Sequence, residues 1–248
     1  MTTGDGAAAR KDISATAVWL ACAALFAVLM TIVFLWPAAI WGPETVQGRA
    51  SELGVLESVQ NAVLLIALIL MMRLAIVAPE RNLRLWAIFI ALGTFFLLGE
   101  EMSWGQHYFG WATGDLFRSI NDQGETNLHN TEGGWLDQKP RAILLFGMIL
   151  GAIVHPLVKH FRNGRGLFDY PWWLAPTLAS LAPVVFSQIG SLPERIDDLN
   201  DALHLWTFSA QDFTNNFRSS EMEEVFLYVF FISYTASILA RLPQRSAG

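Results

Sequence analysis

Cysteine and charge are both scarce in this chain, and each shortage excludes a class of protein. Cys22 is the only cysteine, which excludes a disulfide framework, a thiolate zinc site and a Cys-x-x-Cys redox pair. Charged residues make up 15% of the chain, whereas about a quarter is usual in soluble proteins. The sequence also has no internal repeat and no low-complexity tract. These shortages favour a single domain that is solvated by a bilayer.

Apolar residues take up 53% of the chain, in runs long enough to cross hydrocarbon as helices. A transmembrane helix needs about 20 such residues. We predict an all-α fold, a polytopic membrane helix bundle with six transmembrane helices. The single domain covers 15–242, between a disordered tail at 1–14 and a short tail at 243–248. The predicted spans are 17–38, 53–77, 84–104, 141–159, 171–191 and 221–241.

Basic residues indicate the orientation of the predicted bundle. Ten Lys and Arg fall on the side that holds both chain ends, and six fall on the other. By the positive-inside rule, the N and C termini are therefore cytoplasmic. All of the 22 acidic residues except Asp5, Asp12, Glu80 and Asp169 lie on the opposite, outward-facing side. We predict a multi-pass protein of the bacterial cytoplasmic (inner) membrane with an acidic extracytoplasmic surface.

Some carboxylates lie inside the predicted spans rather than beyond them, namely Glu57, Glu100, Glu101, Glu223 and Glu224. A charged side chain costs about 2.5 to 3.5 kcal/mol in the middle of a membrane, and less near its surface. Protons, basic side chains or a metal ion can offset that cost. Embedded acids are rarely retained without a task, so we interpret these residues as parts of a functional site.

Histidines supply the argument for a metal. His107, His129 and His204 fall on the acidic side, where Lys and Arg are few. Carboxylate and imidazole together are ligands of zinc, iron and manganese, so a divalent metal is the expected cofactor. An ordinary hydrogen-bonded role stays open for each histidine. The candidate metal ligands are Glu100, Glu101, His129, His204 and Glu224, and the candidate catalytic bases are Glu57, Glu125 and Glu223.

The outer loop 106–140 is unusually long, and we expect it to be a lid or a re-entrant element over the acidic helix ends. Glu125 and His129 stand four residues apart within it, so they can hold one ion if the segment is helical. A structured loop is the alternative. If the preceding predicted helix continued past its span, Glu100 and His107 would share one face, but Gly105 leaves that continuation open.

A second outer segment predicts a short helix. Ser191 and Glu194 form a capping-box pattern before an apolar stripe, which indicates an amphipathic interfacial helix over about 194–208. Its polar face carries acidic residues and His204. Supporting polar roles in the site are assigned to Gln60, Asn61, Ser103, Gln106, His107, Asn127, Asn130, Asp197 and Asp201.

Two segments resemble a signature of uncharacterised bacterial polytopic membrane proteins. They are Gly-Glu-Glu-Met-Ser-Trp-Gly-Gln at 99–106 and Asn-Asp-Gln-Gly-Glu-Thr-Asn-Leu-His-Asn at 121–130. With matching acids in the second and sixth spans, the resemblance covers most of the chain. It implies no particular activity. The residues that it implies to act together are Glu100, Glu101, Gln106, Asn127 and His129.

The chain is similar only in theme to two groups of membrane hydrolases. Proteases of the CAAX-processing type carry a Glu-Glu-x-x-x-Arg motif, but Gly105 occupies the arginine position here. Alkaline-ceramidase-like hydrolases bind zinc with a His-x-x-x-His pair that this chain lacks. In both groups, buried polar groups of a helical bundle activate water.

The leading hypothesis is a metal-dependent membrane enzyme of the hydrolase type, with an outward-facing pocket that acts on a lipid or lipid-linked substrate. A membrane binding or assembly protein with an acidic outer surface is the first alternative. A cation- or proton-coupled transporter is the second, and it would need ionisable groups towards the midplane, where none is evident. Membrane lipid is the expected partner, and nucleic acid is not.

Overall fold

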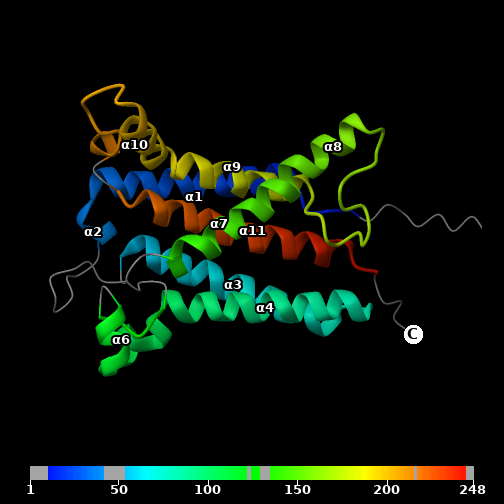
Figure 1. Cartoon of the computed structure of the whole chain (residues 1–248). Helices are drawn as coiled ribbons and strands as arrows, with labels where there is room; N and C mark the ends of the chain where they lie inside the picture. The colour runs from blue at the N-terminus through cyan, green and yellow to red at the C-terminus, as the bar shows by residue number, and fades with distance from the viewer. Residues whose placement is uncertain (1–10, 42–53, 122–123, 129–134, 215–216, 244–248) are drawn as a thin grey trace, which may run out of the picture.

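The computed structural model describes residues 11–41, 54–121, 124–128, 135–214 and 217–243, with the backbone alone at 41 and 135–140. Five helices within these ranges are long and apolar enough to cross a membrane. The predicted helical membrane bundle is confirmed at this level (Figure 1). The long helices are α1 (Ala15–Leu35), α3 (Val55–Val77), α4 (Arg81–Glu101), the stretch Arg141–Phe161 that ends in α8, and α11 (Ser219–Arg241).

The fifth predicted span, 171–191, differs most from the structure. The chain is helical there only in the 3-10 helix η3 (Leu178–Ser180) and in α9 (Leu181–Gly190). Pro171 and Pro176 explain the late start, because proline has no N–H for a helix and disfavours helical backbone in the residue before it. The other predicted spans correspond to the five long helices, with ends that differ by up to six residues.

A π-helical segment, η2 (Leu150–Val154), joins α7 (Trp135–Ile149) to α8 (His155–Phe161). Pro156 accounts for the irregularity, since its ring and its missing N–H interfere with the regular helical hydrogen bond to the preceding turn. A widened π turn accommodates such a residue without ending the helix. The ring of Pro176 lies 2.8 Å from where a Cβ on Gly151 would stand, so the approach to α9 is packed tightly on this segment.

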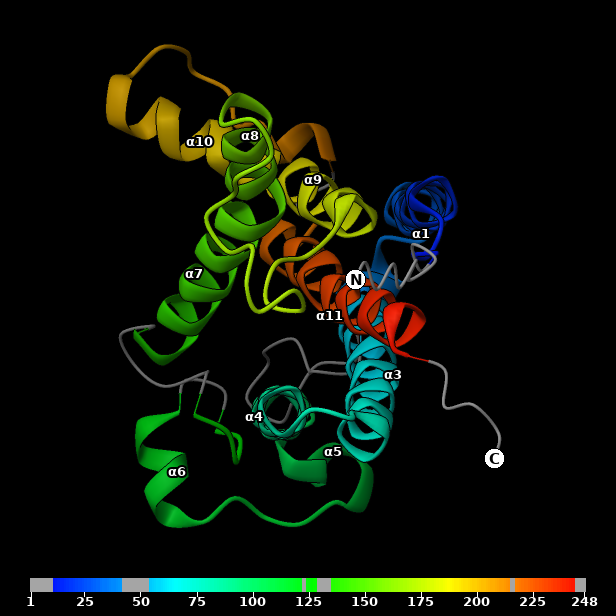
Figure 2. The same cartoon turned by 90° about the vertical axis from the view of Figure 1, so that its right-hand side faces the viewer.

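Helix α11 is the centre of the bundle. It lies between α1 and α9 on one side and α3 and α4 on the other, with α7 crossing beside it (Figures 1 and 2). In its apolar window 72% of the residues are buried, against 17% to 39% in the other long helices. Those outer helices expose large apolar side chains such as Ile76 and Phe95, as helices that face lipid do.

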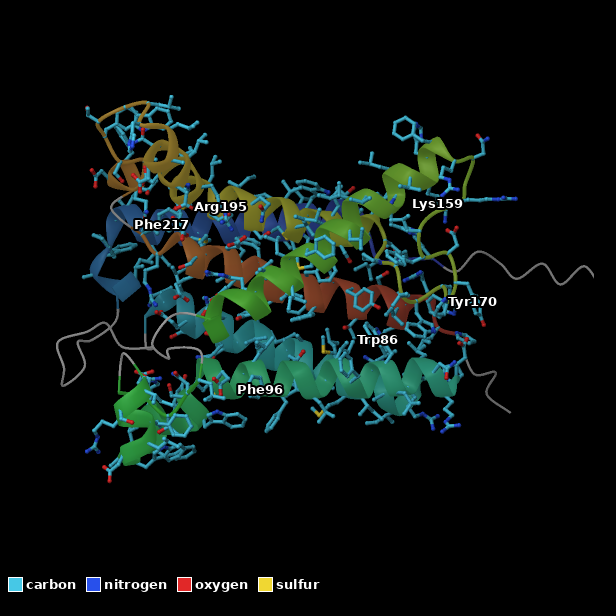
Figure 3. All side chains as sticks on the ribbon, in the orientation of Figure 1. Trp86, Phe96, Lys159, Tyr170, Arg195 and Phe217 are labelled. Atoms are coloured by element: carbon cyan, nitrogen blue, oxygen red, sulfur yellow. The ribbon has the colours of Figure 1, made fainter. Side chains whose placement is uncertain are left out.

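The two ends of the bundle differ in their side chains. Figure 3 shows Lys159 and Tyr170 at one end and Arg195 and Phe217 at the other. We call the second the acidic end, and it is formed by the C terminus of α4 and the N termini of α3, α7 and α11 (Figure 1). Short elements extend it, namely α2 (Ala38–Trp41), η1 (Ser103–Gly105), α5 (Gln106–Phe109), α6 (Asp115–Ile120), α10 (Leu192–Leu203) and η4 (Gln211–Thr214).

Several predicted boundaries at this end need correction. The predicted loop 106–140 contains α5, α6 and the first turns of α7. The interfacial helix predicted over about 194–208 is α10, which ends at Leu203 because His204 takes a left-handed φ of 51°. The predicted capping box is not formed, since Ser191 continues the helical backbone of α9 and its side chain caps nothing. Of the predicted tails, residues 1–10 and 244–248 lie outside the described ranges.

Candidate functional site

A cavity of about 1030 Å³ lies between α4, α7 and α11. Apolar side chains form most of its wall. Phe89 on α4 and Ile143 on α7 line it while being 67% and 73% exposed, so the cavity opens sideways between these two helices. Its charged groups gather at the acidic end, where Glu100, Glu101, Arg141 and Glu224 form a cavity mouth together with Tyr228.

Two pairings organise the cavity mouth. The Tyr228 hydroxyl donates to Glu101 Oε1 at 2.7 Å. Arg141 Nη1 lies 3.3 Å from Glu224 Oε1. Glu224 and Tyr228 are four residues apart on α11 and share its face, so both side chains turn towards the cavity. The mouth therefore presents carboxylates, a phenol and a guanidinium to a molecule that enters from the apolar side.

Glu100 is held by groups that arrive from beyond the end of α4. The Trp104 indole N–H donates to Glu100 Oε1 at 2.8 Å, and the backbone N–H of Leu128 donates to Glu100 Oε2 at 2.5 Å. Helix α4 does not continue past its span, because Ser103, Trp104 and Gly105 have φ values of 46°, 54° and 93°. Non-glycine residues hold such values at a cost of about 1 to 3 kcal/mol each, and here the turn folds the indole back onto Glu100.

The loop beyond α5 and α6 is organised around a second carboxylate. Glu125 Oε2 accepts hydrogen bonds from Ser103 Oγ at 2.8 Å and Asn127 Nδ2 at 3.0 Å, and Glu125 Oε1 lies 3.2 Å from His107 Nε2. We call these four residues the Glu125 cluster. Gln106 supports it by accepting the backbone N–H of Thr126 at 2.8 Å. Residues 124–128 form a structured loop rather than a helix, and the cluster places Leu128 against Glu100.

Glu57 lies in the first turn of α3 at the acidic end and does not line the cavity. Its buried carboxylate forms an ion pair with Arg218, which also holds Glu221 at 2.6 Å. Gln60 donates to Glu221 Oε2 at 2.8 Å and to Glu224 Oε2 at 3.3 Å, which links this group to the cavity mouth. Glu57 and Gln60 therefore face the N-terminal part of α11, and the charge of Glu57 is offset by an arginine.

Glu223 and Glu224 turn to different neighbours, because consecutive residues on a helix point about 100° apart. Glu224 lines the cavity, whereas Glu223 accepts from Gln188 Nε2 on α9 at 3.1 Å and pairs with Arg195 at 3.5 Å. The carboxylate of Glu223 is 2% exposed. It is therefore separated from the cavity mouth by the body of α11.

The polar residues predicted on α10 lie elsewhere. Asp197 accepts hydrogen bonds from Ser209 Oγ at 2.6 Å and from the backbone N–H of Ala210 at 2.5 Å, and these bonds lower its pKa. Asp197 thus organises the loop after α10. Asp201 and His204 are exposed, and α10 stands well apart from the end of α4 in both views (Figures 1 and 2). The structure does not bring His204 to the cavity mouth.

The sequence predictions also included His129, Asn130, Asn61 and a metal. His129 and Asn130 lie outside the described residues. Asn61 is buried on α3, and no described residue hydrogen-bonds its Oδ1. Among the described residues, no group of three or more His, Cys, Asp or Glu is close enough to hold a metal ion. The metal therefore stays a prediction.

Sequence reasoning missed the basic and phenolic partners of the embedded acids. Three of these acids pair with an arginine: Glu224 with Arg141, Glu223 with Arg195, and Glu57 with Arg218. A fourth, Glu101, accepts a hydrogen bond from the Tyr228 hydroxyl. For Arg218 a partial signal was present, because it precedes Glu221 by three residues at the start of a predicted helix, a spacing at which opposite charges meet. Outward-facing Lys and Arg are few, but three arginines are enough to pair three of the five embedded acids.

Comparison with protein-family models, curated proteins and solved structures finds no match. The resemblance of 99–106 and 121–130 to a bacterial membrane-protein signature therefore stays an expectation. Function has to be argued from the cavity and its mouth.

Proposed function

We propose that this protein is a membrane enzyme of the hydrolase type, which takes the apolar chain of a lipid or lipid-linked substrate into the cavity. The polar head of that substrate would meet Glu100 and Glu101. The observation that carries the proposal is the shape of the cavity, which is apolar along its length, open between α4 and α7, and polar at one end.

The dimensions of the cavity support a lipid chain. Its lining on α4 runs from Trp86 to Glu100, which is about 21 Å along a helix that rises 1.5 Å per residue. One leaflet of a bilayer contributes about 15 Å of hydrocarbon, half of the roughly 30 Å core. A chain can therefore enter from the side and lie along α4 with its head at the level of the mouth.

Orientation is part of the proposal. We place both termini in the cytoplasm and the acidic end on the extracytoplasmic side of a bacterial cytoplasmic membrane, as the distribution of Lys and Arg favours. An even number of crossings is then needed, so α9 and the segment before it complete a sixth crossing beside the five long helices. The cavity mouth would lie near the outer headgroups, where a lipid head is expected.

The chemistry at the mouth suits hydrolysis. A carboxylate within hydrogen-bonding reach of a water molecule can act as a general base, and Glu101 is positioned for this by the Tyr228 hydroxyl. The guanidinium of Arg141 would stabilise negative charge that develops on the attacked group. Glu57, Glu125 and Glu223, the bases predicted from sequence, do not line the cavity, so we assign the reacting role to Glu100 and Glu101.

A divalent metal is a separate part of the proposal. Glu100, Glu101 and Glu224 all line the mouth, but the described residues hold no group of three acids close enough for a metal, so binding one would require these carboxylates to move closer together. Metal analysis of protein purified in detergent without chelator tests this point. We expect a bound zinc, iron or manganese ion that the Glu100→Gln variant loses; a clean preparation without metal would refute the cofactor and leave the carboxylate mechanism standing.

Cavity-filling variants test the lipid site. Gly93 on α4 and Gly147 on α7 line the cavity, and a Cβ added at either position meets no atom within 4 Å. Gly147→Leu should therefore fold while occupying the space of the chain. We expect it to retain much less lipid than wild type when both are purified from the same host and bound lipid is measured by mass spectrometry.

The matched control is Ala142→Leu, which enlarges an exposed side chain on the same helix outside the cavity. Equal lipid content in Gly147→Leu and this control would contradict the lipid site. Turnover is then tested with vesicles of the expression host's total lipid, in which the wild type should change the lipid composition over time. Bound lipid without any turnover would refute the enzymatic half and favour a lipid-binding protein.

A further inference from the structure

We infer that Phe168 forms the floor of the cavity and sets the length of the apolar chain that it accepts, with His155 and Gly166 holding it in place. This inference rests on the proposed lipid site and names the residue that would determine its specificity. It concerns the end of the cavity that is opposite the mouth.

Phe168 comes from outside the long helices. It lies in the segment between α8 and η3, at the end of the bundle where Figure 3 labels Lys159 and Tyr170. It nevertheless lines the cavity, together with Trp86 and Tyr234 from the same end of α4 and α11. On the long helix that contains α7, the lining ends at Gly151, and Phe168 closes the space one turn further on.

His155 holds Phe168 by two kinds of contact. The backbone N–H groups of Leu167 and Phe168 both donate to His155 Nδ1, at 3.1 and 3.0 Å. The rings of His155 and Phe168 stack with centroids 5.8 Å apart and planes inclined by 13°. Because Nδ1 accepts both bonds, the ring proton is on Nε2. His155 is 5% exposed, so its contacts with Leu167 and Phe168 are shielded from solvent.

Gly166 allows the segment to approach the imidazole so closely. A Cβ at this position would stand 2.3 Å from His155 Cε1, which is too close for any side chain. Asp169 closes the turn by accepting the Gly166 N–H at 2.6 Å, and Lys159 pairs with Asp169 at 3.4 Å. Residues 166–169 therefore form a compact turn fastened to α8, which positions the Phe168 ring.

Phe168 would therefore limit the length of the apolar chain that the cavity can hold. A chain whose head lies at Glu100 and Glu101 extends along α4 until it meets the aromatic floor. Removing the Phe168 ring frees the space of several methylene groups, since a phenylalanine side chain buries far more apolar area than one methylene does. Longer chains should then fit, whereas the contacts of the head at the mouth stay unchanged.

The test compares wild type, Phe168→Ala and Gly166→Ala, each in detergent micelles with an equimolar mixture of saturated monoacylglycerols from decanoyl to eicosanoyl. Native mass spectrometry reports which chain lengths are bound. We expect Phe168→Ala to shift the bound distribution towards longer chains by several methylene groups. Gly166→Ala keeps the ring but displaces the turn, so it should broaden the distribution.

The control variant is Phe161→Ala, which removes a 78% exposed phenylalanine of α8 that does not line the cavity. It should bind the same chains as wild type. If all four proteins bind monoacylglycerol with the same length distribution, Phe168 does not set the chain length, although the lipid site itself is supported. Failure of every protein, wild type included, to bind any of the chains would overturn both the length limit and the lipid site. If Phe168→Ala does not fold, Gly166→Ala decides the outcome by the same criterion.

Discussion

Glu101 and Glu223 are both carboxylates buried near the acidic end of a long helix, at 7% and 2% exposure, yet they face different surroundings. Glu101 lines a cavity and accepts a hydrogen bond from the Tyr228 phenol. Glu223 faces α9 and is neutralised by Arg195. Burial within a membrane helix therefore shows that a carboxylate needs a partner, whereas contact with a cavity shows that it can meet a substrate.

The sharpest test of this comparison exchanges each acid for its amide. Glu101→Gln should lower turnover of host lipid in vesicles by about 10²- to 10⁴-fold, the usual contribution of a general base, while bound lipid stays near the wild-type level. Glu223→Gln should keep its turnover within a few-fold of wild type. An equal loss in both variants would show that the cavity does not separate the two acids.

A second test concerns the stability of the paired acids. Arg218→Met removes the partner of Glu57 and should destabilise the protein by about 3 to 5 kcal/mol, because it leaves a buried charge uncompensated. Reversible unfolding in mixed micelles measures the loss. The control is Asp115→Asn, which breaks an exposed pair with Arg118 worth about 0 to 1 kcal/mol and leaves the Arg118 hydrogen bond to the Thr113 carbonyl in place. Similar losses in the two variants would contradict the buried ion pair.

The Glu125 cluster should matter less than the ion pairs. Ser103→Ala removes the hydrogen bond that the Ser103 hydroxyl donates to the Glu125 carboxylate and the one that it accepts from Asn127, and should cost about 1.5 to 3 kcal/mol. Hydrogen exchange should show faster opening of 124–128, because the cluster positions that loop. Ser119→Ala serves as the control, since among the described residues the Ser119 hydroxyl donates only to the nearby carbonyl of Leu116. Unchanged exchange at 124–128 would mean that the loop is held in another way.

The smallest effect is expected at Asp197, away from the cavity. Hydrogen bonds from the Ser209 hydroxyl and the Ala210 backbone N–H hold the pKa of Asp197 below the ordinary value of an aspartate. A group with a lowered folded-state pKa contributes stability above its unfolded pKa and loses it as the pH falls through the folded value. Asp197→Asn should therefore flatten the stability profile slightly below about pH 4 and leave turnover unchanged. Altered turnover would place α10 in the site after all.

The predictions from sequence succeeded where local pattern was sufficient. The long apolar runs matched five helices, and the stripe of 194–208 matched most of α10. They failed where one residue changes the backbone path. Pro176 shortened the fifth predicted helix, and the left-handed turn at Ser103 and Trp104 ended α4 before the predicted face could continue.

The carboxylates of the candidate site show the same division. Their placement near helix ends followed from counting residues along the spans, and Glu100, Glu101 and Glu224 do line one mouth. Their partners could not be predicted by counting along one helix. Arg141 lies on a different helix from Glu224, and Tyr228 lies within an apolar stretch of α11, on a different helix from Glu101. The predicted site residues do not all converge on the cavity. Glu57 pairs with Arg218, Glu223 pairs with Arg195, and His204 is exposed.

The amino-acid sequence by itself determined that the chain is a bundle of apolar helices with acids embedded at one end, because helix length and hydropathy are local properties that a bilayer selects directly. Only the tertiary structure decided which acids meet a cavity and which meet an arginine. The reason is that neighbouring residues such as Glu223 and Glu224 differ by about 100° around the helix, so the packing of α4, α7 and α9 on α11 assigns them opposite roles.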